Sequence, residues 1–458
     1  MDALPKPPPL PEPFFRRNAI SFKMAGILIL ALLLLIPLAL IRSLISERQA
    51  RRDEAVMDIT STWGHQQVVV GPVLIVPYEY KTKSWKEEVV NGKRERVEVL
   101  ETLAANAFFL PSELSVAGQV DPSKLHRGIY EAIVYKSELA VSGRFSPPDF
   151  GALGIAPENV RWAQAQVTMA VSDLRGVGDV LTMKLGELTG EFVPGCRLTG
   201  YDSGITARFP GLQAGSNLSF QMTLDLKGSG GVQFAPVGQK TRVKMTSSWA
   251  DPSFFGAFLP TDRMVGPKGF EASWEVSWYG RSYPQQTTDQ TKGYAFSPEQ
   301  VEPSLFGVNF LSGVDSYRMV ERAAKYGILF IALIFTAFFL FEILSALSIH
   351  TVQYTLVGAA LCLFYLALLS LSEFIRFGYA YWGGAVASSL LIVFYSLKVL
   401  GGGLRTLIIA VALAAIYTYL YVVLQMQDYS LLFGTAGLFV VLGIVMYATR
   451  NVDWSTRK

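Results

Sequence analysis

The sequence predicts a membrane protein of mixed α + β class, with an N-terminal transmembrane anchor, a large β-rich, sandwich-like domain and a C-terminal helical bundle. First, 51% of its 458 residues are hydrophobic and only 17% are charged, which is too apolar for an ordinary soluble protein. Second, apolar runs long enough to cross a bilayer lie near residues 24–41 and again from residue 326 onward. Third, the stretch between them consists of short alternating runs separated by Gly and Pro, a pattern typical of strands.

These observations divide the chain into six segments. The first is Pro-rich and basic, and we expect such a segment to be disordered. The β-rich segment has room for one large sandwich or for two lobes, and the sequence leaves both open. The predicted segments are a cytoplasmic tail (1–23), a first span with a helical stem (24–61), the β-rich domain (62–311), a second stem and span (312–347), four more spans (348–449) and a short tail (450–458).

The segment 312–347 joins the β-rich domain to the bundle. It begins as a charged amphipathic helix, with Ser312 and Asp315 at capping-box spacing, and turns into an apolar span without a clear break. Residues 326–347 would rise about 33 Å as a helix, enough to cross a bilayer. We expect this helix to be continuous, and its charged first part to lie beside the stem that follows the first span.

The predicted topology has six membrane spans, five of them in the C-terminal bundle, so both termini lie on the same side. Lys398, Arg405 and Arg450 fall on that side, whereas the opposite short loops offer only Arg376. Because basic loop residues favour the cytoplasm, both termini are expected in the cytoplasm and the β-rich domain in the periplasm.

Composition and motifs argue against several function classes. A net charge of +3 gives no basic field for nucleic acid. The three histidines are scattered, and there is no P-loop, no HExxH and no G-x-S-x-G motif. We therefore expect no catalysis, no cofactor and no metal, with a periplasmic hydrolase kept as an alternative.

One acidic residue, Glu342, lies inside a predicted span. A charge there costs at least ~2.5 kcal/mol and is a functional candidate by default. We interpret Glu342 as a hydrogen-bonding group between neighbouring helices, with His350 as its expected partner and proton or ion coupling as the alternative. At the other end of the bundle, Glu373 and Arg376 are expected to pair with each other.

The stretch 249–260, WADPSFFGAFLP, is a candidate interaction loop. Pro and Gly prevent a regular element over its whole length, so Trp249, Phe254, Phe255 and Phe258 need another explanation. One interpretation is that they plug one end of the β core. The other is that some are exposed and dock a partner, because clustered apolar side chains on a surface mark interaction sites.

Several longer segments resemble a known family. They include ERQARRDEA (47–55), HRGIYEAIVY (126–135), SSWADPSFFGAFLP (247–260), YRMVERAAKYGILF (317–330), HTVQYTLVGAALCLFYLALLSLSE (350–373) and YATRNVDW (447–454). In this order, and over nearly the whole chain after Lys23, they resemble the CreD family of cell-envelope integrity proteins. The resemblance implies a multi-pass inner-membrane protein of a Gram-negative bacterium, linked to envelope stress and the β-lactam response. It implies no accepted biochemical activity.

The expected function is therefore that of a non-enzymatic envelope protein. Besides the lipid bilayer, its β-rich domain would bind an unknown envelope protein, lipid or glycan. A membrane transporter or lipid-handling permease is the alternative, although few polar groups are available to line a path. Small residues on the fourth span (Gly383, Gly384, Ala387 and Ser388) suit close helix packing within the bundle, with a homo-oligomer as the alternative.

Overall fold

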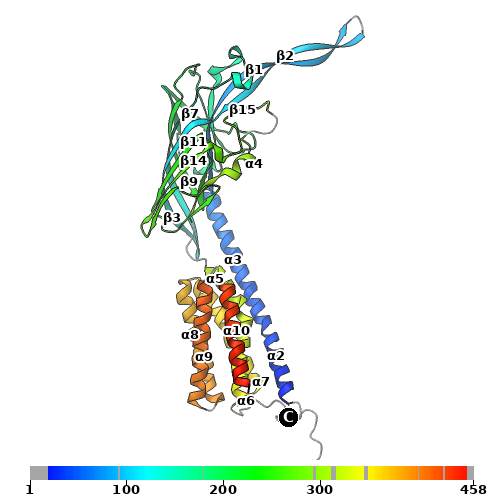
Figure 1. Cartoon of the computed structure of the whole chain (residues 1–458), viewed down its shortest axis with the longest axis vertical. Helices are drawn as coiled ribbons and strands as arrows, with labels where there is room; N and C mark the ends of the chain where they lie inside the picture. Colours follow the sequence, from blue (N-terminus) through cyan, green and yellow to red (C-terminus); the bar gives the residue numbers. More distant parts are fainter. Residues whose placement is uncertain are drawn as a thin grey trace, which may run out of the picture. The chain divides into compact units, whose positions relative to one another are not determined.

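A computed structural model describes residues 19–90, 93–178, 180–291, 296–310, 316–344, 349–400, 402–426 and 429–450 (Figure 1). The chain forms two compact units. The helical unit combines 1–53 with 314–458, and the β unit is 54–313. The expected capping start at Ser312 and most of both expected tails lie outside the described residues.

The helical unit contains the apolar helices that the sequence predicts. Among the described residues, five helices are long and apolar enough to cross a membrane when 23–63 counts as one, or six when the bent pair α5–α6 is counted as one span. The helices are α2 (Ala19–Leu33), α3 (Leu35–Trp63, shared with the β unit), α5 (Ser316–Lys325), α6 (Gly327–Leu344), α7 (Thr351–Ser372), α8 (Phe377–Val399), α9 (Gly403–Gln425) and α10 (Ser430–Thr449). Because α2 begins at Ala19, the last residues of the expected disordered tail are helical.

The expectation of one continuous helix after residue 312 is wrong. The helix breaks at Tyr326, and α5 is bent by 45° relative to α6. Amphipathic α5 buries Met319, Val320 and Ala323 on one face while its other face is charged. In contrast, α6 is apolar apart from Thr336 and Glu342. The bend lets the amphipathic α5 and the mostly apolar α6 follow different directions, each in the surroundings that suit its side chains.

The predicted N-terminal span packs in the same unit as the C-terminal bundle. A Cβ placed on Gly327 would come within 2.8 Å of Leu38, and one on Gly358 would collide with Leu34. These two glycines let the N-terminal helices approach α6 and α7 closely, as small residues do in membrane helix packing. The first span is broken once, at Leu34, near Pro37, which has no N–H to donate.

The described strands of the β unit form one 16-stranded sheet. Its main path runs β12-β16-β10-β1-β5-β8-β7-β6-β9-β4-β3-β11-β14-β13, with β2 and β15 attached beside β1. The strands are β1 (Gln67–Val90), β2 (Lys93–Phe109), β3 (Pro111–Arg127), β4 (Tyr130–Phe145), β5 (Gln166–Val171), β6 (Thr182–Leu185), β7 (Leu188–Pro194), β8 (Gly204–Arg208), β9 (Ser219–Ser229), β10 (Gly231–Phe234), β11 (Lys240–Ser247), β12 (Pro252–Gly256), β13 (Asp262–Gly266), β14 (Gly269–Ser277), β15 (Gln286–Thr288) and β16 (Phe306–Phe310).

The sheet folds back on itself around a single core. Strand β7 pairs with β8 on one side and with β6 on the other, and so joins the two halves. Side chains from the two halves meet inside the fold. The ring centre of Tyr135 on β4 lies 5.2 Å from that of Phe310 on β16, and the ring centre of Trp274 on β14 lies 5.8 Å from that of Phe306. One hydrophobic cluster includes residues of both halves, so the β unit is sandwich-like and the two-lobe alternative is not what the structure contains.

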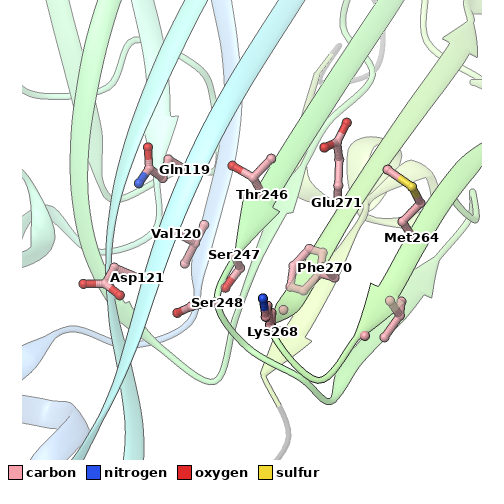
Figure 2. Close-up of a pocket in the computed structure, with 13 residues that line it drawn as sticks. Gln119, Val120, Asp121, Thr246, Ser247, Ser248, Met264, Lys268, Phe270 and Glu271 are labelled. Atoms are coloured by element: carbon pink, nitrogen blue, oxygen red, sulfur yellow. The ribbon is translucent and has the colours of Figure 1, made fainter.

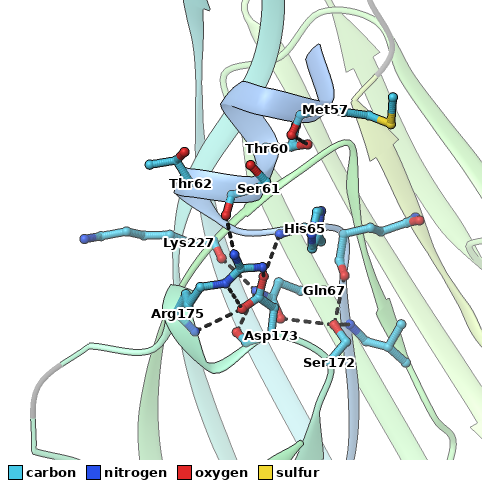
Figure 3. A network of polar contacts seen from close by, with 12 residues as sticks. Met57, Thr60, Ser61, Thr62, His65, Gln67, Ser172, Asp173, Arg175 and Lys227 are labelled. Atoms are coloured by element: carbon cyan, nitrogen blue, oxygen red, sulfur yellow. Dashed lines mark hydrogen bonds and ion pairs between the residues drawn. The ribbon is translucent and has the colours of Figure 1, made fainter. Parts of the chain in front are cut away.

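The end of α3 is fixed to the β unit by polar contacts (Figure 3). Trp63 donates its indole N–H to the carbonyl of Tyr135 (3.2 Å), and Arg175 donates to the carbonyl of Ser61. The helix ends before Gly64, whose φ of +136° suits glycine alone. The residues 54–63 are therefore part of the β unit.

Strands β1 and β2 continue beyond the rest of the β unit as a two-stranded ribbon (Figure 1). They pair in register from Leu74 with Phe109 to Val90 with Lys93. The exposed side chains of Trp85 and Leu100 belong to this ribbon. A two-stranded ribbon is marginally stable alone, so this one depends on the parts of β1 and β2 that pair within the larger sheet.

Candidate functional sites

Glu342 lies in a polar cluster within the helical unit. It is 8% exposed, forms an ion pair with Lys23 of α2, and accepts hydrogen bonds from the hydroxyl of Tyr354 (3.1 Å) and the backbone N–H of Ile349 (3.2 Å). The carboxylate thus has a cation and two donors, as a buried charge requires. This arrangement fits a structural role.

His350 does not join this cluster, although we expected it to pair with Glu342. It is the N-cap of α7, where its Nδ1 accepts from the N–H of Val352 (3.3 Å), and its own N–H donates to Gln353 (2.9 Å). A cap satisfies orphan donors at a helix start. Sequence reasoning missed Lys23, because it lay in the predicted tail, and Tyr354, because its helical position relative to Glu342 was unknown.

A second buried carboxylate, Glu373, lies at the C-terminal end of α7. It accepts a hydrogen bond from the Tyr317 hydroxyl of α5 (3.0 Å), and Nε of Arg48 lies 3.8 Å away. The guanidinium of Arg52 lies 5.5 Å from the centre of the Tyr317 ring. The expected pairing of Glu373 with Arg376 is not observed, since Arg376 instead precedes α8 as its N-cap.

The expected stem contact is present within the helical unit. Arg42 donates from Nη2 to the carbonyls of Ala324 (2.9 Å) and Lys325 (3.3 Å) at the end of α5. Arg52 reaches Tyr317 at the beginning of α5. The two segments therefore run in opposite directions and are bridged by side chains. However, α5 also packs on α7 and α9, so it belongs to the bundle and is not a free stalk.

In the β unit, the loop from Trp249 contains strand β12, which pairs with β16 at one end of the sheet. Phe254 packs against the core, with its ring 5.5 Å from Phe270 and 5.7 Å from Trp274. Phe258 packs 5.9 Å from Phe306, and Trp249 also lies against the core. Phe255, the next residue after Phe254, points to the opposite face of the strand. The geometry therefore distinguishes Phe255 from the other three aromatic residues.

Next to this loop, an open groove of 600 Å³ crosses four neighbouring strands (Figure 2). In the register of β3, β11, β14 and β13, the residues Gln119, Thr246, Glu271 and Met264 form a row. Lys244 pairs with Glu271 at 2.7 Å. Ser248 and Phe270 also line the groove. Because Phe270 contacts Phe254, the groove lies next to the loop that follows Trp249.

Strand β13 forms the outer wall of the groove. It pairs with β14 and ends the path of the described strands. Met264 is 69% exposed and Val265 is 51% exposed. An exposed edge strand offers unpaired backbone donors and acceptors to another chain. Sequence analysis did not predict this strand, because Asp262–Gly266 has no clear alternation and follows a proline-rich loop.

A buried polar network lies where the end of α3 meets the sheet of the β unit (Figure 3). Asp173, which is 7% exposed, accepts from Arg175 (2.7 and 2.9 Å) and from the backbone N–H of His65 (3.0 Å). The hydrogen bonds from Arg175 lower the pKa of Asp173 to about 2. In addition, Gln67 donates to the carbonyls of Asp173 and Lys227. The network ties α3, β1 and β9 together, which is a structural arrangement.

The chemistry of these sites is that of contact and charge pairing. Within the described ranges, no three His, Cys, Asp or Glu side chains come together as metal ligands. Burial raises the pKa of the Cys196 thiol, which makes it a poor nucleophile. Glu79 and Arg161 form an ion pair at 2.6 Å. It joins β1 to the loop before β5, which is a structural contact.

Together, the apolar helices and the separate β-rich domain define a multi-pass membrane protein. The family model for the inner membrane protein CreD matches residues 19–455. The chain is also 32% identical over 441 residues to the inner membrane protein CreD of Escherichia coli (strain K12), covering 96% of this chain and 94% of that protein. The chain belongs to the CreD family of inner membrane proteins.

Comparison with solved structures gives only remote similarity. A zinc metallopeptidase of the M1 class from Deinococcus radiodurans matches 48% of this chain and 53% of its own, with 8% identity and a TM-score of 0.20. A two-domain M1 zinc metallopeptidase variant bound to tryptophan matches with 8% identity and a TM-score of 0.18. Neither similarity supports an argument about fold or activity.

Proposed function

We propose that this chain is a non-catalytic inner-membrane protein that maintains the cell envelope under stress, including β-lactam stress. In this proposal the β unit faces the periplasm and binds another envelope component, while the helical unit holds it at the membrane. The groove bounded by β13 is the observation that carries the binding role.

The groove suits an extended polypeptide. Edge strand β13 provides backbone groups for strand addition, and alternate side chains such as Met264 can contact pockets or apolar side chains of the added chain. The neighbouring row from Gln119 to Glu271 adds hydrogen-bonding groups and one carboxylate, which is paired with Lys244. A partner protein is therefore favoured over a glycan or a lipid.

Complementation of cells that lack the gene tests this function. Met264→Arg places a charge on the exposed edge strand, and we expect it to reduce survival under a β-lactam to the level of the null cells at normal protein abundance. Val180→Arg is the matched control, because Val180 is 72% exposed and is not among the residues that line the groove.

The same experiment identifies the bound component. A photo-crosslinking residue at position 264 should give a defined adduct in the membrane fraction, and one at position 180 should not. Equal survival of both arginine variants, together with no adduct specific to position 264, would rule out the groove as the binding surface.

The helical unit favours a structural role over transport. Tyr417 lies at the centre of a packed aromatic cluster, 4.8 Å from both Phe330 and Phe364. Its hydroxyl bonds Ser388 (2.7 Å), and its carbonyl accepts from Tyr381 (2.7 Å). These polar groups satisfy each other between α8 and α9, as interhelical hydrogen bonds in membrane proteins do.

A further inference from the structure

Basic side chains gather where the N-terminal helix meets α5. Most of them have a carboxylate partner. Arg48 lies beside Glu373 (3.8 Å), Arg51 pairs with Glu47 (2.7 Å), Arg52 with Asp53 (3.1 Å) and Lys325 with Glu321 (2.9 Å). Four acidic side chains are thus already engaged at this end of the helical unit.

Arg42 and Arg322 have no carboxylate partner in the described part of the chain. Arg42 makes both of its hydrogen bonds from Nη2, to the carbonyls of Ala324 and Lys325. Arg322 lies in the last turn of α5, the turn that carries these two carbonyls. Its Nη2 is buried and has no hydrogen-bond partner among the described residues. An unsatisfied buried donor is costly, and the hydrogen bonds of Arg42 go only to neutral carbonyls. An anion at this place would therefore compensate the charge of Arg42 and give Arg322 the partner that it lacks.

Their position indicates which anion. The charged, amphipathic helix α5 gives way at Tyr326 to the apolar helix α6, so α5 lies at the level where the hydrocarbon of the bilayer ends. Phospholipid phosphates lie at this level. Arginine matches phosphate oxygens with paired N–H donors.

The surroundings distinguish a lipid from free phosphate. The turns of α3 before Arg42 expose Ile36 (59%) and Leu40 (67%). Acyl chains can therefore cover the helix directly below the arginine. A free phosphate ion would gain nothing from these apolar side chains.

We propose that Arg42 and Arg322 bind the phosphate of an anionic phospholipid at the corner between α3 and α5. The lipid phosphate compensates the two arginines, and its acyl chains lie along the first span. The site is independent of the groove on the β unit and of the function proposed for it.

Native mass spectrometry of the full-length protein in detergent tests the site. Phosphatidylglycerol and phosphatidylcholine with the same acyl chains are added separately, and inorganic phosphate is added as a competitor. We expect the protein to retain phosphatidylglycerol in preference to phosphatidylcholine, and millimolar inorganic phosphate not to displace it.

Substitutions locate the binding. Arg42→Gln and Arg322→Gln should each weaken phosphatidylglycerol binding about fivefold, the usual effect of one basic residue near an anionic membrane surface. Arg51→Gln is the matched control, because it removes the same charge from the same helix but from a residue already paired with Glu47. It should leave lipid binding nearly unchanged.

The exposed Arg42 keeps the test decisive even if Arg322→Gln does not fold, because its replacement removes no buried side chain. The proposal is wrong if Arg42→Gln binds phosphatidylglycerol as well as Arg51→Gln does. It is also wrong if the unaltered protein binds both lipids equally, or if inorganic phosphate displaces the lipid.

Discussion

Individual charged residues hold the N-terminal helix in the bundle at two levels. Lys23 pairs with Glu342, and Arg48 lies beside Glu373. The 25 residue steps from Lys23 to Arg48 rise about 38 Å as a helix, which exceeds the roughly 30 Å of the hydrocarbon core. Both pairs can therefore lie near headgroups, where a charge is less costly than at the centre of the bilayer.

Replacing Glu342 separates structure from proton coupling. Glu342→Gln keeps hydrogen-bonding ability for Tyr354 and Ile349, and Lys23 can extend toward the interface, so we expect near-normal abundance and function. Glu342→Ala leaves these donors unsatisfied and should destabilise the helical unit by about 1–3 kcal/mol. Abundance and thermal unfolding in detergent measure this. Loss of function by Glu342→Gln at normal abundance would instead favour proton coupling and a transporter.

Asp173 gives the β unit a pH dependence. Its pKa falls from 3.8 to about 2 in the folded protein because Arg175 stabilises the carboxylate. A lowered pKa contributes stability above pH 4, and this contribution is lost as the pH falls from about 4 to about 2. Asp173→Asn should therefore cost about 2 kcal/mol near neutral pH and progressively less below pH 4.

Thermal unfolding of the full chain at several pH values measures this difference. Asp225→Asn is the control, since Asp225 is exposed on β9 and should have little effect at any pH. A cost of Asp173→Asn that stays constant between pH 6 and pH 2.5 would contradict this account of the network.

At the level of elements, close helix packing depends on glycines that face larger side chains. Gly358 of α7 receives Leu34, with Phe335 at 3.0 Å from the position of an added Cβ. The N-terminal helix therefore approaches α7 at a distance that a larger side chain would not permit. In strand β12, packing depends instead on the alternation of side chains, because Phe254 is directed to the core and Phe255 to the opposite face.

Gly358→Val should displace the N-terminal helix and cost about 1–3 kcal/mol, as overpacking does elsewhere. Gly443→Val on α10 is the control, because nothing lies within 4 Å of its added Cβ. Thermal unfolding in detergent compares the two. Leu34→Ala should restore part of the loss, and failure to do so would mean that Leu34 is not the side chain that collides.

The aromatic residues of the loop after Trp249 should respond unequally. Phe254→Ser and Phe258→Ser remove rings that pack on the core and should each cost about 2–4 kcal/mol, somewhat less than the largest values for fully buried Phe. Phe255→Ser should cost less than 1 kcal/mol. Abundance and thermal unfolding of each variant measure this. Equal losses for all three would place Phe255 in the core as well.

At the scale of the whole molecule, the proposed function requires a particular membrane orientation, with the β unit in the periplasm and both termini in the cytoplasm. The loops near Lys398 and Arg405 favour the cytoplasm by the positive-inside tendency. The arginines after the first span do not oppose this, because long domains cross irrespective of their charge.

Reporter fusions test the orientation. Fusions after Ser61 should report the periplasm, and fusions after Gly402 and Lys458 should report the cytoplasm. Alkaline phosphatase and fluorescent protein reporters on the same fusion points give opposite readouts and control for expression. A cytoplasmic result at Ser61 would contradict the proposed function as well as the topology.

Local pattern in the sequence was sufficient for the class, the spans and the presence of a β-rich domain, because continuous apolarity and period-two alternation are properties of neighbouring residues. The resemblance that pointed to the CreD family also lay in contiguous segments. Lys23, Tyr317 and Tyr354 could not be matched to their carboxylates, because contacts between distant segments depend on helix rotation and register. For the same reason, only the tertiary structure decided the bend at Tyr326, the single folded sheet, and the groove beside β13. A one-residue change in strand register reverses which side chains face the core, and no local pattern fixes that choice.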